Sequence, residues 1–92
     1  MSLQIKHDTN ARTYIGEIEG KHAHVDYIMD RNETHYLTHT EVHKDLSGKG
    51  IASKMVEHVL QDIENRGKKV VALCPYVINY IKRNPEWKRI LK

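Results

Sequence analysis

Residues 43–55 read "HKDLSGKGIASKM", and this stretch joins two very different halves of the chain. Gly48 and Gly50 make it the most glycine-dense turn of the sequence, and a regular helical pattern follows directly. Glycine lets a backbone approach a ligand closely, and the first turn of a helix offers unpaired amide groups at the positive end of its dipole. The stretch therefore predicts either an anion site, with a phosphate as its natural occupant, or a flexible turn that leads into an ordinary helix.

Polar side chains beside the two glycines strengthen the anion-site interpretation. Lys49 contributes a positive charge, and Ser47 and Ser53 contribute hydroxyl donors. The phosphate loop of nucleotide triphosphatases is absent, because its two glycines are separated by four residues and those of this turn by one. A dinucleotide-binding turn is also absent, because that turn follows the first strand of a parallel sheet.

After the turn, the pattern predicts one long amphipathic helix. Ile51, Met55, Val59 and Ile63 recur every four residues between positions 47 and 66, so one face of the helix is apolar. Gly67 follows at the position where glycine commonly ends a helix.

The segments on either side of the helix predict an α+β fold. Residues 3–8, 12–20, 23–30 and 34–43 alternate apolar and polar side chains or are rich in strand-forming residues, so we expect a four-stranded antiparallel meander. The nearly all-apolar run "KKVVALC" predicts a fifth strand that is covered on both faces. Two segments that begin with proline, 75–84 and 85–92, predict short C-terminal helices.

Length and composition suit one globular domain over residues 1–92. No apolar run approaches the length of a membrane span, and the N-terminus does not resemble a signal peptide, so we expect a cytoplasmic protein without a membrane partner. The net charge of +3 suits an anionic ligand better than it suits nucleic acid, which needs a concentrated basic face. We therefore expect no nucleic-acid partner, although Tyr76, Tyr80 and Trp87 leave base stacking as a weaker alternative.

The order of these elements and three short motifs resemble the GNAT superfamily of acetyl-CoA-dependent N-acetyltransferases, in particular its small stand-alone members. The motifs are "HTEV" (39–42), "GKGIAS" (48–53) and "CPYV" (74–77). Gly50 and Ala52 match the family's pyrophosphate-binding signature, whereas Ser47 stands where the family has arginine or glutamine. The chain lacks the helices that normally follow the first strand, and it lacks the last two strands.

The resemblance implies acetyl-CoA as the cofactor and an unidentified amine or thiol acceptor. We also expect a monomeric protein. The main chain of Val42 is implied to pair with the pantetheine arm. The residues implied to bind the cofactor are Val42, His43, Ser47, Gly48, Lys49, Gly50, Ile51, Ala52, Ser53 and Asn79.

Cys74, the single cysteine, is the candidate nucleophile, and His39 on the preceding strand is the candidate base. A thiol beside the cofactor could accept the acetyl group if a neighbouring base lowered its pKa. The alternative is that Cys74 is a small buried apolar residue and that His39 is structural. A protein that binds acetyl-CoA without catalysing transfer is the corresponding alternative function.

The seven histidines also raise the question of a metal site. His35, His39 and His43 lie four residues apart, a spacing that would stack them on a helix. On a strand, which rises about 3.3 Å per residue, the outer two lie too far apart to share one ion. We therefore expect no metal.

Overall fold

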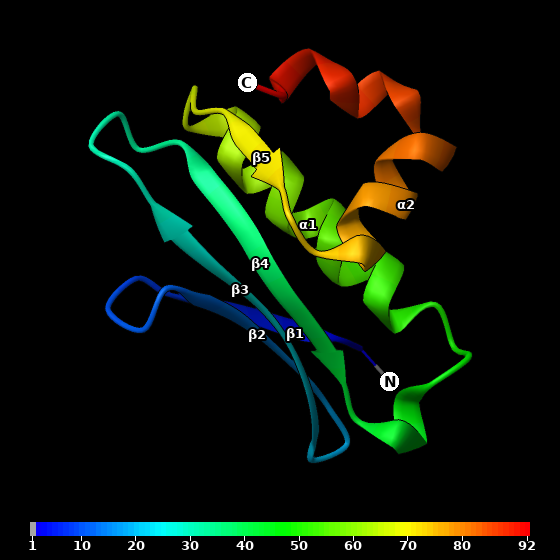
Figure 1. Cartoon of the computed structure of the whole chain (residues 1–92). Coiled ribbons are helices and arrows are strands. Elements are labelled where there is room, and N and C mark those ends of the chain that lie inside the picture. The colour runs from blue at the N-terminus through cyan, green and yellow to red at the C-terminus, as the bar shows by residue number, and fades with distance from the viewer. Residues whose placement is uncertain (1) are drawn as a thin grey trace.

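The structure is a computed structural model and describes residues 2–92. These residues form five strands, two α-helices and two short 3₁₀ helices (Figure 1). In chain order the elements are β1 (Gln4–Asp8), β2 (Thr13–Ile18), β3 (Lys21–Met29), β4 (His35–Val42), η1 (Lys44–Leu46), α1 (Ile51–Asn65), β5 (Val70–Ala72), α2 (Pro75–Arg83) and η2 (Pro85–Ile90).

The strands form one sheet in the order β1-β2-β3-β4-β5. The first four are antiparallel neighbours joined by short turns, which confirms the predicted meander and α+β class. β5 then pairs in parallel with the first half of β4, from His35 opposite Val70 to Leu37 opposite Ala72. The parallel direction follows from α1, which carries the chain back between the two strands.

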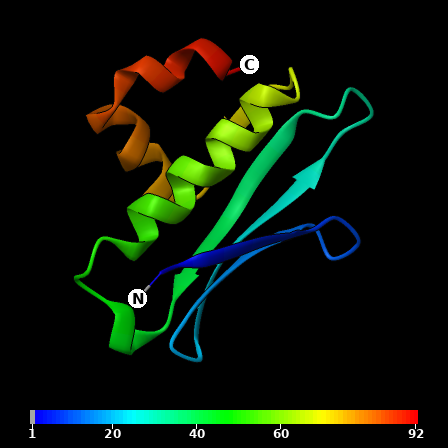
Figure 2. The ribbon, with the colours of Figure 1, turned by 180° about the vertical axis from the view of Figure 1, so that it is seen from behind.

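The core lies between the sheet and the helices, which all lie on one side of the sheet (Figures 1 and 2). Tyr14, Val25 and Leu37 point inward from three strands and are fully buried. Met55 and Val59 meet them from the apolar face of α1 and are also fully buried. The opposite face of the sheet carries no helix and is largely polar.

An irregularity in β4 decides which of its side chains face the helices. Leu37 lies opposite Tyr27, but His39 lies opposite Asp26, so Thr38 has no partner on β3 and forms a bulge. The alternation of side chains reverses at this point. His35 and Leu37 face the helices before the bulge, and the even-numbered residues face them after it.

The last segment is a short helix as expected, and it has 3₁₀ geometry. Two sequence-based expectations about these elements were wrong in detail. The helix expected from Ser47 begins at Ile51, because Gly48 and Gly50 have positive φ angles (77° and 73°) that no right-handed helix contains. β5 is not covered on both sides: Val71 is half-buried, and Leu73, just after the strand, is 53% exposed.

Between residues 2 and 92, no helix has both the length and the apolar character needed to cross a bilayer.

Candidate functional site

A pocket of about 350 Å³ opens where the end of β4 meets the glycine turn and the first turns of α1 and α2. β4 and β5 have separated here, because Leu73 and Cys74 both donate their N–H groups to the carbonyl of Leu37 and the chain then turns into α2. The pocket is lined by Thr40, Val42, Leu46, Ser47, Gly48, Gly50, Ile51, Ala52 and Tyr76.

The glycine turn supplies an open anion-binding end to this pocket. Gly50 is the N-cap of α1, and no side chain caps the helix, so its first amides are free to bind another acceptor. A Cβ added at Gly48 or Gly50 would meet no atom of the protein within 4 Å, so the space beside the turn is open. Lys49 lies exposed between the two glycines. Free amides, open space and a nearby lysine are the features that a phosphate-binding turn requires.

Cys74 lies next to this pocket without lining it, and it contacts one of the lining residues. Its Sγ donates a hydrogen bond to Oγ1 of Thr40, a pocket-lining residue, at 3.4 Å. The cysteine is the N-cap of α2, and only 6% of its surface is exposed. Tyr76, in the first turn of α2, lines the pocket and shares a hydrogen bond of 3.0 Å with Ser53 of α1. The two helices are thus tied together beside the thiol.

The surroundings of Cys74 favour its thiolate form. Burial raises the pKa of the thiol, but the hydroxyl of Thr40 and the first-turn amides of Val77 and Tyr76 lower it by more. The net effect is a lowered pKa. No capping hydrogen bond to the sulfur forms in this geometry, so the amides act on it as nearby dipoles rather than as direct donors.

Some of the predicted cofactor residues lie around the pocket without lining it. His43 caps the 3₁₀ helix η1, since its Nδ1 accepts a hydrogen bond from the amide of Asp45 at 3.0 Å. Ser53 reaches the pocket through Tyr76, and Lys49 extends from the turn. Asn79 is exposed on α2, three residues after Tyr76 and so on a similar side of that helix.

The structure does not bring His39 to Cys74. His39 is on the uncovered face of the sheet, where its ring lies 5.8 Å from that of His24 and its Nε2 lies 3.6 Å from Oε1 of Glu41. Thr40, its neighbour, faces the helices and contacts Cys74. The expected pairing was therefore wrong, because the bulge at Thr38 places His39 on the other side of β4.

Thr40, Leu46 and Tyr76 line the pocket but were not among the residues that the sequence assigned to the site. Simple alternation from the buried Leu37 predicts that Thr40 faces away from the helices, and only the bulge reverses this. Tyr76 carried a usable signal: it follows Pro75, which marks the first turn of a helix, directly after the candidate cysteine.

The three evenly spaced histidines, two in β4 and one just after it, are also separated. His35 is buried in the core, His39 lies on the uncovered face and His43 caps η1. Within the part of the chain that the structure describes, no three His, Cys, Asp or Glu side chains are arranged to hold a metal ion.

Comparison with known proteins agrees with this architecture. Residues 12–90 match the family described as GCN5-related N-acetyl-transferase, and this range includes the glycine turn, the pocket and Cys74. The chain belongs to this family. The matched range begins just before β2 and extends to the end of η2, so it contains every element of the described structure except β1.

Proteins of similar sequence occur in vertebrates. Protein NATD1 of Xenopus tropicalis is 29% identical over 86 residues, which cover 91% of this chain and 79% of that protein. Protein NATD1 of Gallus gallus is 29% identical over 87 residues, covering 90% and 77%. Protein NATD1 of Homo sapiens is 28% identical over 87 residues, covering 90% and 75%.

Proposed function

We propose that this chain binds acetyl-CoA in the pocket between β4 and α1 and transfers the acetyl group to an amine or thiol acceptor. One observation carries the proposal: Thr40 lines the pocket that begins at the glycine turn and also contacts Sγ of Cys74. Thr40 thus connects the cavity at the glycine turn with a thiol whose pKa is lowered. Membership of a GCN5-related family supports acetyl-CoA as the donor.

The glycine turn would hold the pyrophosphate of acetyl-CoA. The free amides at the start of α1 would donate to the phosphate oxygens, and the helix dipole would favour their negative charge. Ser47 can add a hydroxyl donor from the pocket wall, and Lys49 can add a charge from outside it. Both contributions are smaller than that of the backbone, because the two side chains are exposed.

The last residues of β4 would hold the pantetheine arm. β4 continues through residues 38–42 beyond its last pair with β5, so this part of the strand has no neighbour on that side. Val42 lines the pocket at the end of this segment, close to the glycine turn. Acetyl-CoA supplies a thioester, whose carbonyl carbon is open to attack by a nucleophile.

Cys74 would attack that thioester as a thiolate. Its sulfur forms a bond to the carbonyl carbon, the bond to the sulfur of CoA breaks, and CoA leaves as a thiolate that takes up a proton. The acceptor then attacks the acetylated Cys74 and releases its thiol. Thr40 would donate a hydrogen bond to the thiolate and keep the sulfur directed toward the pocket.

The position of His39 favours a second function, which is binding of acetyl-CoA without catalysis. Because His39 faces away, Cys74 has no hydrogen bond to a histidine base among residues 2–92, and the same pocket could bind acetyl-CoA without catalysing transfer. Direct transfer to an acceptor amine, without an acetylated cysteine, needs a base as well.

Mass spectrometry of the intact protein tests the covalent route. After incubation with acetyl-CoA, we expect an adduct of one acetyl group that hydroxylamine removes and that Cys74→Ser does not form. Thr40→Val should slow adduct formation and raise the pH at which it occurs, because the thiolate loses its hydrogen-bond donor. Thr38→Val is the matched control, since Thr38 bonds to the backbone of β3 instead.

Calorimetric titration with CoA separates the remaining possibilities. Cys74→Ser should bind CoA as the natural protein does, because the thiol is not part of the glycine turn. Tight binding of acetyl-CoA without an adduct and without acetylation of any added amine would support the binding-only function. Failure to bind CoA at all would refute the proposal.

A further inference from the structure

The outer edge of β5 is open to pairing with another strand. β5 is the last strand of the sheet, so β4 occupies only one of its edges. His35 donates its N–H to Lys69, and Leu73 donates its N–H to Leu37, which directs the odd-numbered residues of β5 toward β4. Val70 and Ala72 therefore direct their N–H and C=O groups toward the open edge. Such an edge is a template for strand addition.

The last two residues of the sequence pair with part of this edge. Leu91 forms an isolated parallel bridge with Val70, and Lys92 donates its N–H to the carbonyl of Val70 at 3.0 Å. This pairing covers only the first residue of β5. The backbone groups of Ala72 lie beyond it, so the edge accepts strand geometry and is only partly filled.

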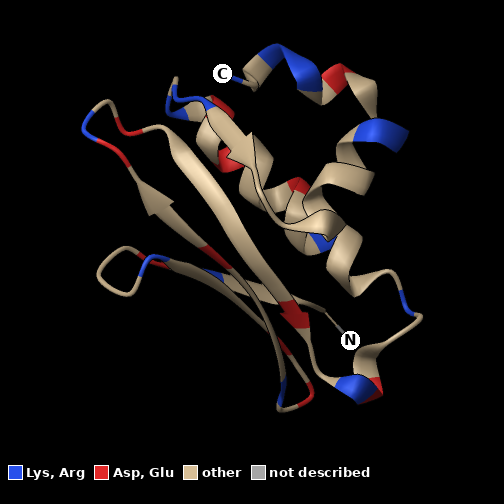
Figure 3. Cartoon of the chain, viewed as in Figure 1, with Lys and Arg blue, Asp and Glu red and all other residues tan. Residues whose placement is uncertain are grey.

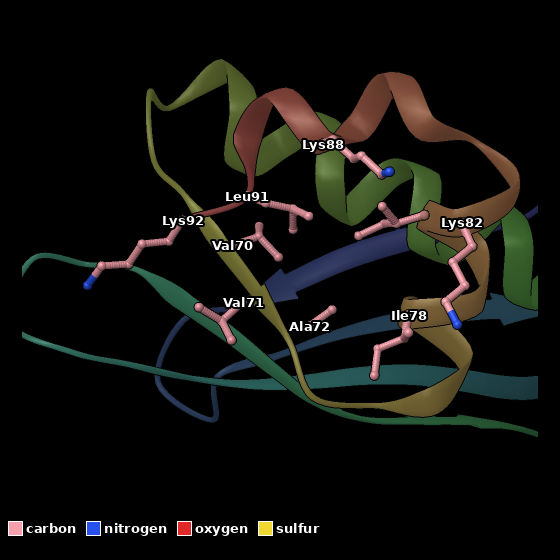
Figure 4. A pocket seen from close by; sticks show the side chains of 9 residues that line it. Val70, Val71, Ala72, Ile78, Lys82, Lys88, Leu91 and Lys92 are labelled. Atoms are coloured by element: carbon pink, nitrogen blue, oxygen red, sulfur yellow. The ribbon is translucent and has the colours of Figure 1, made fainter.

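A groove of about 500 Å³ runs beside the same edge (Figure 4). Val70 and Ala72 form one wall, Ile78 and Ile81 of α2 form the other, and Leu91 closes one end. Ile78 is 36% exposed, which is high for an isoleucine beside a core. The groove is thus an apolar surface that continues directly from the unpaired backbone.

The charged residues that line the groove are all lysines. Lys82 and Lys88 lie on its helical side and Lys92 lies on the strand side (Figure 4). Among residues 2–92, neither Lys82 nor Lys88 forms an ion pair, whereas Lys92 lies 3.6 Å from Asp30. Basic residues also lie in the last turn of α2 and in the last turn of η2, whereas the first turn of η2 carries the acidic Glu86 (Figure 3). An apolar floor with a positive rim is complementary to an anionic, partly apolar ligand.

We infer that this groove, lined by β5, α2, η2 and the C-terminus, binds an extended acidic peptide of a partner protein. The peptide pairs with Ala72 as an additional strand. Its alternate apolar side chains enter the groove, and its carboxylates lie on the other side, near the lysines. A second copy of this chain is a poor occupant, because two such edges would place lysines against lysines. This surface is separate from the acetyl-CoA pocket.

Titration of the ¹⁵N-labelled protein with the acetylated and amidated hexapeptide EVEVEV tests the inference. The amides of Ala72 and its neighbours should shift, and hydrogen exchange at Ala72 should slow as its N–H becomes paired. The peptide KVKVKV should bind about tenfold more weakly or worse. Methylation of the alternate peptide nitrogens that face β5 should abolish binding, whereas methylation of the other nitrogens should not.

Charge-reversed variants locate the site on the protein. The double variant Lys82→Glu/Lys88→Glu should weaken binding of EVEVEV about tenfold. The double variant Lys6→Glu/Lys54→Glu has the same net charge, but its substitutions lie at exposed positions of β1 and α1. It should not weaken binding of EVEVEV. Melting temperatures of both variants establish that they remain folded.

Other outcomes would overturn the inference. The inference would be wrong if EVEVEV did not bind at about 1 mM, if both double variants bound it equally, or if hydrogen exchange at Ala72 did not change. It would also be wrong if octanoate, an anionic and apolar molecule without a peptide backbone, bound to the groove and methylation of the peptide did not affect peptide binding. A concentration-dependent dimer that protects Ala72 without peptide would identify a second copy as the occupant instead.

Discussion

In the proposed function, Gly50 is the residue whose replacement should weaken binding of the cofactor phosphates most directly. Its φ angle of 73° strains any other residue, and the space beside it is free of protein atoms. In Gly50→Val the side chain would fill that space. We expect the affinity for CoA, measured by calorimetry, to fall at least about tenfold while the protein stays folded.

Gly67 provides the control for this substitution. It lies at the other end of α1, has a φ angle of 72° and also has open space around it. Gly67→Val therefore carries the same backbone strain, about 1–2 kcal/mol, without a change at the pocket. Equal CoA affinities in the two folded variants would show that the glycine turn does not hold the phosphates.

The contrast between Gly50 and His39 shows which parts of the site a sequence can indicate. The glycine turn was predictable because its chemistry is local: two glycines, a lysine and a helix start lie within a few residues. The partner of Cys74 was not predictable, because it depends on the register between β3 and β4. One unpaired residue, Thr38, exchanges His39 for Thr40 on the pocket side.

At the scale of elements, the close approach of β2 and α1 rests on Gly16. An added Cβ at Gly16 would lie 2.5 Å from Sδ of Met55 and 3.1 Å from Cδ1 of Leu3. Met55 is fully buried and has little room to move. We expect Gly16→Ala to lower the free energy of unfolding by about 1–3 kcal/mol, measured with urea.

A double-mutant cycle identifies the cause of that loss. Met55→Val removes the sulfur that the new methyl group would meet, so the double variant Gly16→Ala/Met55→Val should be more stable than the sum of the single effects allows. Gly20→Ala combined with Met55→Val is the control, because Gly20 has no atom within 4 Å of an added Cβ. Additive losses in both pairs would exclude the contact with Met55 as the cause.

The elements themselves were largely predictable, and their ends were less so. Each strand of the meander alternates apolar and polar residues between short turns, and α1 repeats its apolar residues every four positions. The start of α1 was placed at Ser47 instead of Ile51, since the apolar pattern does not reveal the backbone angles of Gly48 and Gly50. Pro85 indicated a final helix but did not indicate its 3₁₀ geometry.

At the scale of the whole molecule, a polar cluster joins the first three strands to the end of α1. Nε2 of His7 lies 2.6 Å from the hydroxyl of Tyr27, and the ring of His7 stacks on that of Tyr14. Tyr14 donates a hydrogen bond to Asp62, which also pairs with Arg66. The cluster thus ties distant parts of the chain through groups that include a titratable imidazole.

A second histidine, His35, lies beside this cluster and is 2% exposed. Its Nδ1 bonds to the carbonyl of Glu33 at 2.9 Å, while Nε2 is buried without a partner among the described residues. Burial lowers the pKa of His35 despite that hydrogen bond. Burial and then Arg66 lower the pKa of His7, against an opposing effect of Asp62.

Lowered histidine pKa values predict a loss of stability in mild acid. The folded state disfavours the protonated imidazoles. The stability that the neutral imidazoles contribute is therefore complete above the unfolded pKa of about 6.5 and is lost as the pH falls toward the folded pKa. We expect the urea midpoint to fall between pH 7 and pH 5. His35→Phe should reduce this dependence, and the exposed His22→Gln should not. An identical pH dependence in all three proteins would assign it to other groups.

The arrangement of the whole molecule was predictable except at the outer edge of β5. Short connections between alternating segments imply neighbouring antiparallel strands, and a helix before the last strand implies a parallel return. The open side of β5 was not predictable. Its all-apolar sequence is typical of a strand buried on both faces, but no later part of the described chain covers it beyond Leu91 and Lys92.

The bulge gives β4 one residue more than β3 needs between the partners of Tyr27 and Asp26. A one-residue deletion in a regular strand moves every residue that follows to the opposite face of the sheet. Removal of Thr38 would instead make Leu37 and His39 consecutive residues, so that His39 would still face away from the helices and Thr40 and Val42 would still face the pocket. Thr38 is therefore a position at which β4 should tolerate a change of length that would disrupt the site elsewhere in a regular strand.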